Sequence, residues 1–433
     1  MTGRLDFMQR VNCKELTANT LRNNPVVRHN CCMPCNFVGP PVRGADCYGR
    51  EAFVDLVWEK LSFGHVLLAS PRRFGKTSVM YRLMDEPRWD YRLVHCDLEH
   101  FLEPADLLTA LVVQLSRDDV LSKIASALSF VPKKAWQGFR ANVEEIELHK
   151  LKLKLKEQIR PRWQTSGEEL FDAIARIPET KVVFLLDEFA VMIDEMAHLD
   201  AHREDARLML RWLRHLRQSP RIQNVRFLVA GSIGIGNVLS NLGESASMND
   251  FAHLKLEPFT DAVADQFLLA LSESHDIPLS TAARKKVLDL IGTPVPYFLQ
   301  IMFWEIERSC KGSGITPTPA TVETLYPSTV LGADCKTYFD HYYGRLRDYY
   351  DKPDEKAAKA LLRTIANDGV LKREACYYLY RKECEVADIE RFNGLMANLE
   401  NDFYVGFNYG QNTYEFSCKL LRDWWLRHYG MEC

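Results

Sequence analysis

Short apolar runs and amphipathic stretches alternate along the chain as far as Pro258. The segments at 64–70, 91–100, 181–190 and 224–234 read as strands, and 181–190 is a continuous apolar run that ends in two carboxylates, as a strand buried on both faces does. The stretches at 48–61, 71–86, 103–118, 167–179 and 204–218 carry apolar residues at helical spacing. Strand and helix in alternation predict an α/β fold, with a parallel sheet flanked by helices.

Residues 143–156 depart from this alternation and change to a period of two. Leu151, Leu153 and Leu155 alternate there with Lys150, Lys152, Lys154 and Lys156. The pattern predicts a half-exposed strand, and we expect a β-hairpin inserted near 143–156. Lysines on a strand protect a sheet edge more often than they bind phosphate, so we assign them to solvent.

Beyond Pro258 the strand pattern stops, and 260–276, 280–292 and 295–312 read as successive helices. After a turn-rich linker, three helical stretches precede a strand–turn–strand segment at 403–416 and a last helix. That order suggests a winged helix-turn-helix. The predicted organisation is therefore an extended segment 1–40, an α/β core 41–256, an all-α lid 257–330 and a winged-helix domain 331–433.

The composition limits the class of protein without naming its chemistry. A chain of 433 residues suits two or three domains, and 47% hydrophobic with 26% charged residues is typical of a folded protein. A net charge of −3 gives no global positive field for nucleic acid. No apolar run is long enough for a membrane helix and no signal peptide is evident, so we expect a cytoplasmic protein with no membrane partner.

The chain has 12 cysteines, which we expect to be reduced thiols in that compartment. Cys32 and Cys35 have the C-x-x-C spacing of a metal or redox pair, with Cys31 beside them. A structural zinc site needs a second such pair, which the chain lacks. Packed thiols are favoured, and metal binding is left open.

The turn after the first apolar run matches a phosphate-binding loop. Ser70 to Thr77 fit G-x-x-x-x-G-K-[ST] at every fixed position except the first. Backbone N–H groups at such a helix start face phosphate oxygens, with Lys76 reaching the β- and γ-phosphates and Thr77 a Mg²⁺ ion. ATP and Mg²⁺ are thus the expected cofactors. The nucleotide-binding residues predicted here are Pro71, Arg72, Arg73, Phe74, Gly75, Lys76, Thr77 and Ser78.

Asp187 and Glu188 end a predicted strand whose carboxyl end should lie beside this loop. We expect Asp187 to hold Mg²⁺ and Glu188 to orient or deprotonate the attacking water. Ser232, at the end of another strand, is placed to contact the γ-phosphate or the water, although a small residue there is equally an ordinary turn former. Lys76, Glu188 and Ser232 are the predicted catalytic residues.

An arginine stripe lies on the predicted helix 204–218 and just before it. Its members are Arg203, Arg207, Arg211, Arg214 and Arg217, at spacings of three and four. Were the chain a homo-oligomer, Arg214 or Arg217 would be candidates for an arginine finger that reaches a neighbour's γ-phosphate. A solvated face is the alternative.

Taken together, the segments PRRFGKTS, LLDEF, AGSIG, VPYFLQ and YEFSCKLLRDWW resemble a known family. They are similar to archaeal-type P-loop ATPases of the STAND class, which are allied to AAA-plus proteins and to origin-recognition initiator ATPases. The resemblance spans residues 44–430. It implies a P-loop NTPase core with five parallel strands, a helical lid and a winged helix.

The resemblance also implies a role for two further segments. Tyr48, Gly49 and Arg50 match the family's entry motif, which lies against the adenine. Gly292 and Pro296 match a lid motif whose proline packs on the base. AAA-plus motors are expected to carry an arginine near that lid helix, and none lies between Lys286 and Arg308. The resemblance therefore implies a nucleotide switch rather than a processive motor.

The segment 388–402 is the candidate recognition helix, and its charge bears on the partner. It carries Asp388, Glu390, Glu400 and Asp402 against Arg391 alone. A helix inserted among phosphates is expected to be basic, so a protein partner is favoured over DNA.

The sequence therefore favours a regulatory ATPase with slow hydrolysis, in which nucleotide held between core and lid controls the winged-helix domain. A DNA-binding, initiator-like or transposition-associated ATPase is the alternative. A nucleotide binder without turnover is a third interpretation.

Overall fold

The structure is a computed structural model that describes residues 33–141, 144–231, 234–384 and 388–431. Its contacts divide the chain into two compact units. One consists of Met1–Glu51, Pro258–Val386 and Val405–Cys433, and the other of Ala52–Glu257 and Ala387–Tyr404. We call the second the sheet unit and the first the helical unit.

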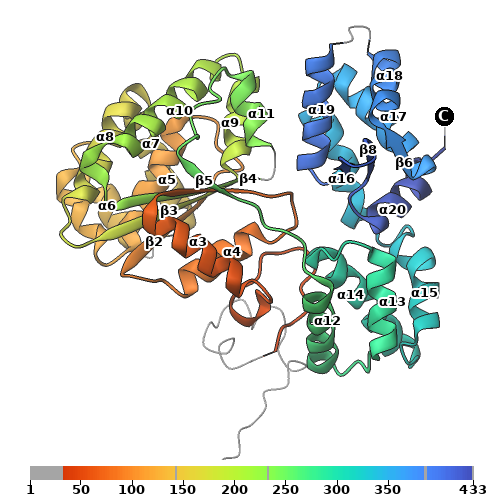
Figure 1. The fold of residues 1–433 in the computed structure, drawn as a ribbon. Helices are drawn as coiled ribbons and strands as arrows, with labels where there is room; N and C mark the ends of the chain where they lie inside the picture. Colours follow the sequence, from red (N-terminus) through yellow and green to blue (C-terminus); the bar gives the residue numbers. More distant parts are fainter. Residues whose placement is uncertain (1–32, 142–143, 232–233, 385–387, 432–433) are drawn as a thin grey trace, which may run out of the picture. The chain divides into compact units, whose positions relative to one another are not determined.

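The sheet unit is built on five parallel strands (Figure 1). They are β1 (His65–Ala69), β2 (Tyr91–Asp97), β3 (Lys181–Asp187), β4 (Val225–Gly231) and β5 (Phe251–Leu254), in the order β2-β3-β4-β1-β5. The apolar runs thus predicted β1 to β4 correctly. β5 is short and only half-buried, so its pattern was too weak to predict from spacing.

Helices cover both faces of this sheet (Figure 1). Their bounds are α3 (Glu51–Phe63), α4 (Lys76–Asp85), α5 (Pro104–Arg117), α6 (Lys133–Arg140), α7 (Glu145–Ile159), α8 (Trp163–Ala175), α9 (Phe189–His198), α10 (Arg203–Gln218) and α11 (Ile235–Asn241), with 3-10 turns at Leu121–Ala127, Arg160–Arg162 and Pro220–Ile222. One core cluster joins a sheet face to helices α5 to α11. The buried side chains of α3 and α4 lie outside that cluster. The predicted α/β fold is confirmed.

The predicted β-hairpin near 143–156 is wrong, because Glu145–Ile159 form the helix α7. Leu148, Leu151, Leu155 and Ile159 are spaced by three and four residues and pack on the core. Leu153, at the centre of the apparent alternation, is 48% exposed. Leucine, lysine and glutamate are all strong helix formers. The segment therefore forms a helix with one apolar face, despite the short alternation of leucine and lysine within it.

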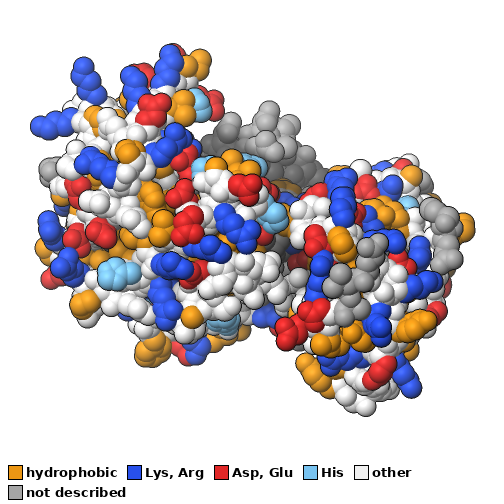
Figure 2. Space-filling model, turned by 90° about the horizontal axis from the view of Figure 1, so that it is seen from above, with side chains coloured by type: hydrophobic (Ala, Val, Ile, Leu, Met, Phe, Trp, Pro, Cys, Tyr) orange, Lys and Arg blue, Asp and Glu red, His pale blue; other side chains and the backbone are white. Residues whose placement is uncertain are grey.

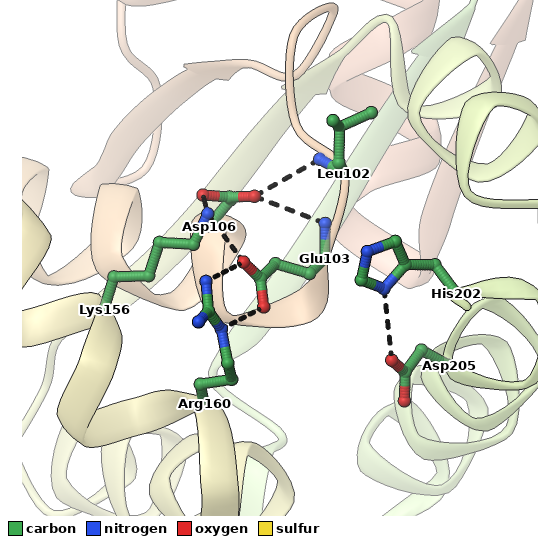
Figure 3. A network of polar contacts seen from close by, with 7 residues as sticks. All are labelled: Leu102, Glu103, Asp106, Lys156, Arg160, His202 and Asp205. Atoms are coloured by element: carbon green, nitrogen blue, oxygen red, sulfur yellow. Dashed lines mark hydrogen bonds and ion pairs between the residues drawn. The ribbon is translucent and has the colours of Figure 1, made fainter. Parts of the chain in front are cut away.

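A network of charged groups fixes α7 to the start of α5 (Figure 3). Lys156 lies 2.7 Å from Glu103 and 2.5 Å from Asp106, and Arg160 donates two hydrogen bonds to Glu103. Asp106 in turn accepts from the backbone N–H groups of Leu102 and Glu103, which closes a capping box at the start of α5. The lysines we assigned to solvent thus include one that is structural.

The helical unit contains the predicted helices at 260–276, 280–292 and 295–312, as α12 (Asp261–His275), α13 (Thr281–Ile291) and α14 (Pro296–Ser313). The next elements are α15 (Pro319–Leu325), a π-helical turn at Tyr326–Val330, α16 (Lys336–Tyr349), α17 (Lys352–Asp368) and α18 (Arg373–Glu383). An antiparallel sheet of β6 (Val370–Lys372), β8 (Thr413–Phe416) and β7 (Val405–Asn408), and then α20 (Lys419–Tyr429), complete it. A short 3-10 turn, Gly44–Asp46, lies near its start.

Two aromatic side chains of α16, Phe339 and Tyr342, are buried in the helical unit. Phe339 lies between Phe298 of α14 and Trp424 of α20, with ring centroids 5.9 and 5.8 Å away. Tyr343 stacks on Tyr429 at 3.8 Å. These contacts account for Phe339 and Tyr343 by packing.

The remaining helix, α19 (Ile389–Asn401), makes most of its contacts within the sheet unit and is therefore assigned to that unit. The chain order α17, β6, α18, α19, β7, β8 is the one expected for a winged helix. The winged-helix domain and the domain limits at 256 and 330 stay predictions.

Charged side chains of both signs are mixed on the face of the molecule that Figure 2 shows. Lys and Arg side chains are interspersed there with Asp and Glu among the described residues. Within the described parts of the chain, no helix has the length and apolar character needed to cross a membrane.

Candidate functional site

The predicted phosphate-binding loop connects β1 to α4. β1 ends at Ala69 and α4 begins at Lys76, with Gly75 as its N-cap at φ 95°. Glycine adopts this left-handed backbone without strain, whereas an L side chain rarely does. The first N–H groups of a helix have no partner within the helix, so the loop and the start of α4 form an anion-binding geometry.

Lys76 folds back over this loop. Its ammonium donates to the carbonyl oxygens of Ser70 at 2.6 Å and Pro71 at 2.9 Å, and the residue is 5% exposed. A buried ammonium must be hydrogen-bonded, and the two loop carbonyls supply that. The loop therefore already holds a positive charge at its centre, where phosphate oxygens would exchange with the carbonyls.

Thr77 and Asp187 meet across the loop and the end of β3. The Thr77 hydroxyl donates to Asp187 Oδ2 at 2.6 Å, although 110 residues separate the two in sequence. Asp187 is 4% exposed. Burial acts to raise its pKa, but the polar groups of His95 and Thr77 and the charge of Lys76 together hold the pKa of Asp187 below its usual range. The carboxylate is thus kept ionised beside a hydroxyl, a pair of oxygen ligands that Mg²⁺ accepts.

Glu188 follows directly and has an unusual backbone. It is the N-cap of α9 with φ 53° and ψ 30°, and its N–H donates to Asp187 Oδ1 at 3.1 Å. A non-glycine residue in the left-handed region costs of order 1 kcal/mol and is commonest at functional sites. Gly231 ends β4 nearby, and a Cβ on it would lie 2.6 Å from that of Ala190. Ser232 lies outside the described residues, and its role stays a prediction.

His95 is a residue of this site that the sequence pattern did not reveal. It lies on β2, whose Asp97 is paired in register with Asp187 of β3. Its Nε2 atom lies 4.0 Å from Asp187 Oδ2, and its ring packs edge-on against Tyr81 of α4. The available signal was one imidazole in a predicted strand, two residues before the carboxylate of Asp97 that ends it.

The other loop residues are placed as follows. Arg72 faces Glu99 at 3.6 Å, with both side chains about 40% exposed, so this ion pair contributes little. Phe74 is buried and meets the ring of Phe403 edge-on, at 4.9 Å between centroids. Pro71 and Ser78 are buried as well, and Arg73 has φ 70°.

The predicted adenine contacts belong to the helical unit. Tyr48 packs on Phe267 of α12, and Arg50 lies over the ring of Phe259. Gly49 has φ 64°, and a Cβ on it would lie 2.7 Å from Val263. Pro296 is the first residue of α14. The entry motif thus packs locally against α12 and the segment before it, and its contact with nucleotide stays a proposal.

The arginine stripe of α10 is largely used within the sheet unit. Arg207 donates to the Leu242 carbonyl, and Arg211 lies 2.7 Å from Glu244. Arg217 has a fully buried side chain, paired with Asp250 through two hydrogen bonds and with the Ser247 carbonyl. A role in trans would require Arg217 to leave this pair, so we carry forward only the half-exposed Arg214 as a candidate finger.

The cysteines give no metal site in the part of the chain that the structure describes, where no group of three His, Cys, Asp or Glu side chains is arranged to hold an ion. Cys31 and Cys32 lie outside that part. The Cys35 backbone N–H donates to Asp46.

No protein-family model and no curated protein matches the sequence. Among solved structures, the Walker-type ATPase PABY2304 of Pyrococcus abyssi is similar over 90% of this chain and 98% of its own, at 17% identity and a TM-score of 0.56. The ORC2 protein of Aeropyrum pernix matches at 12% identity over 88% and 92% of the two chains, with a TM-score of 0.49. CDC6P of Pyrobaculum aerophilum matches at 12% identity over 89% and 94%, with a TM-score of 0.42. The first match shows that this chain shares the fold of a Walker-type ATPase.

Proposed function

We propose that the chain binds ATP with Mg²⁺ and hydrolyses it slowly, as a nucleotide switch that acts on residues 331–433. The observation that carries this proposal is the Thr77–Asp187 hydrogen bond beside the buried Lys76 ammonium. The loop and β3 thereby bring a cation, a hydroxyl and an ionised carboxylate to one place. Phosphoryl transfer needs this kind of positioning and charge neutralisation more than covalent chemistry.

Each residue would act on a different part of the nucleotide. Lys76 would exchange the Ser70 and Pro71 carbonyls for β- and γ-phosphate oxygens, and backbone N–H groups at the start of α4 would hold the remaining phosphate charge. Thr77 and Asp187 would hold Mg²⁺, which neutralises charge on the phosphates when bound. Glu188 would orient the attacking water and accept its proton.

The base and the neighbouring subunit complete the proposal. Tyr48, Gly49, Arg50 and Pro296 would contact the adenine, which would place nucleotide between core and lid. Arg214 would serve a neighbouring copy in a homo-oligomer. On sequence resemblance we propose that the chain is a P-loop ATPase of the STAND class, allied to origin-recognition initiator ATPases.

Hydrogen–deuterium exchange of the full chain with ATP·Mg²⁺, with ADP and without nucleotide tests the switch. We expect protection of the loop at 70–77 with either nucleotide, and exchange at 331–431 that differs between ATP and ADP. Protection of the loop with no difference at 331–431 would leave a nucleotide binder but not a switch.

We propose a protein partner for residues 331–433, because Asp388, Glu390, Glu400 and Asp402 make α19 and its ends acidic. The order of α17 to β8 favours DNA binding as the second candidate. Titration with duplex DNA at two salt concentrations separates them, because a phosphate-driven contact must strengthen at low salt. No binding at low salt would exclude the DNA alternative.

A further inference from the structure

His95 has a buried nitrogen that the proposed chemistry does not yet use. Its Nε2 is shielded from solvent and has no hydrogen-bond partner among the described residues, and its side chain is 16% exposed. A buried polar atom without a partner is uncommon, and at a functional site it indicates a missing ligand or water. The Asp187 carboxylate lies close by, with 4.0 Å between Nε2 and Oδ2.

Both oxygens of that carboxylate already accept hydrogen bonds. Thr77 donates to Oδ2 and the Glu188 N–H donates to Oδ1. The 4.0 Å separation from His95 is too long for a direct hydrogen bond and suits a shared water between Nε2 and Oδ2. A small polar group such as a water could therefore hydrogen-bond to both Asp187 and His95 of β2.

The ring of His95 is held in place by the same helix that carries the phosphate-binding residues. Tyr81 of α4 packs edge-on against it, with 5.4 Å between ring centroids. Tyr81 follows Thr77 by four residues, so the two side chains share one face of α4. On the other side, β2 and β3 are paired through His95 and Leu185. The imidazole is thus fixed relative to both Thr77 and Asp187.

We propose that His95 is a positioning residue for the cation site, which holds the Asp187 carboxylate and a cation-bound water through Nε2. This inference rests on the proposed nucleotide-binding function. The imidazole acts through Asp187 and does not contact the nucleotide itself. His95 therefore governs how strongly Mg²⁺ supports nucleotide binding, while nucleotide affinity without Mg²⁺ depends on the loop and Lys76. Mutation of a residue that supports a metal ligand in this way commonly lowers metal affinity by about 10- to 100-fold.

The test is a titration of Mg²⁺ into the full-length protein with a fluorescent ATP analogue, with the affinity in EDTA measured beside it. Mg²⁺ is expected to strengthen binding of the ATP analogue. For His95→Ala we expect the Mg²⁺ concentration that gives half of this effect to rise about tenfold, while the affinity for the analogue in EDTA stays within about twofold of wild type. His95→Gln should recover most of the difference, because its Nε2 amide lies the same number of bonds from Cβ as the imidazole Nε2. His95→Phe fills the strand with an apolar ring and should behave like His95→Ala.

Three results would overturn the inference. One is a Mg²⁺ titration that is unchanged in His95→Ala and His95→Phe. Another is wild-type Mg²⁺ dependence in His95→Phe together with a loss in His95→Gln, which would point to ring packing against Tyr81. The third is a fall in EDTA affinity with unchanged Mg²⁺ dependence, which would indicate a structural role. Wild-type protein that binds no nucleotide would instead contradict the proposed function.

Discussion

The Ser70 hydroxyl accepts a hydrogen bond from the backbone N–H of Leu256, with 2.6 Å between Oγ and N. Ser70 stands where the phosphate-loop pattern has its first glycine, and Leu256 follows β5 at the end of the sheet unit. Both residues are buried. The departure from the pattern therefore has a structural reason, since the serine side chain satisfies a buried N–H group.

Ser70→Ala should lower the free energy of unfolding by about 1–3 kcal/mol, the usual cost of leaving a buried donor without a partner. Ser70→Gly should cost at least as much and still bind nucleotide, because glycine is the usual loop residue. Urea unfolding measures the first effect and a binding titration the second. Ser62→Ala is the matched control, since the Ser62 hydroxyl only bonds a carbonyl within its exposed helix turn. Equal unfolding midpoints for Ser70→Ala and wild type would refute the role of this contact.

Glu103 should make stability depend on pH through the network in Figure 3. Burial acts to raise the pKa of Glu103, but hydrogen bonds from Arg160 and Lys156 outweigh it and leave the pKa below its usual range. A lowered folded-state pKa stabilises the fold above the unfolded-state value of about 4.3, and that stability is lost as pH falls through the folded value.

Glu103→Gln should therefore destabilise the protein at pH 7, with a difference from wild type that shrinks as the pH falls below about 4. Urea unfolding at a series of pH values measures this. Glu59→Gln changes an exposed carboxylate and should show neither effect. A difference for Glu103→Gln that stays constant down to the lowest pH would contradict the assigned ion pairing.

Asp250 should be essential to the sheet unit, because it neutralises the fully buried Arg217. Asp250→Asn leaves that cation without its counter-charge and should cost about 3 kcal/mol or more in unfolding free energy. Asp172→Asn removes only a half-buried partner of the exposed Arg221, 3.8 Å away, and should cost less than about 1 kcal/mol. Similar costs for the two variants would show that the Arg217–Asp250 pair is not structural.

Glu188→Gln should separate ATP binding from hydrolysis. The amide keeps the size of the side chain but accepts no proton, so phosphate release should fall by about 10²-fold or more, with ATP affinity little changed. Glu195→Gln, on the same helix α9, is the control and should retain the wild-type rate. If Glu188→Gln released phosphate at the wild-type rate, Glu188 would have no role in hydrolysis.

The sequence predicted the parts of the fold that depend on long, regular patterns. The apolar runs at β1 to β4 and the helical spacing of α12 to α14 are strong because many residues contribute to each. α7 was missed because three leucines and four lysines gave a local period of two inside a longer helical stripe. The position of His95 beside Asp187 depends on the pairing of β2 with β3, which no local pattern encodes. The burial of Arg217 likewise depends on the fold of residues 244–250.

The central claim is that the loop from Ser70 to Thr77 holds the phosphates of ATP through the Lys76 ammonium. Equilibrium binding of a fluorescent ATP analogue in the presence of Mg²⁺ tests it most directly. Lys76→Ala is compared with wild type and with Lys60→Ala, which removes a half-exposed lysine of α3. We expect Lys76→Ala to lose about ten- to hundredfold in affinity, as removal of hydrogen bonds between charged groups does, and Lys60→Ala to match wild type. Equal affinities for all three proteins would contradict the account.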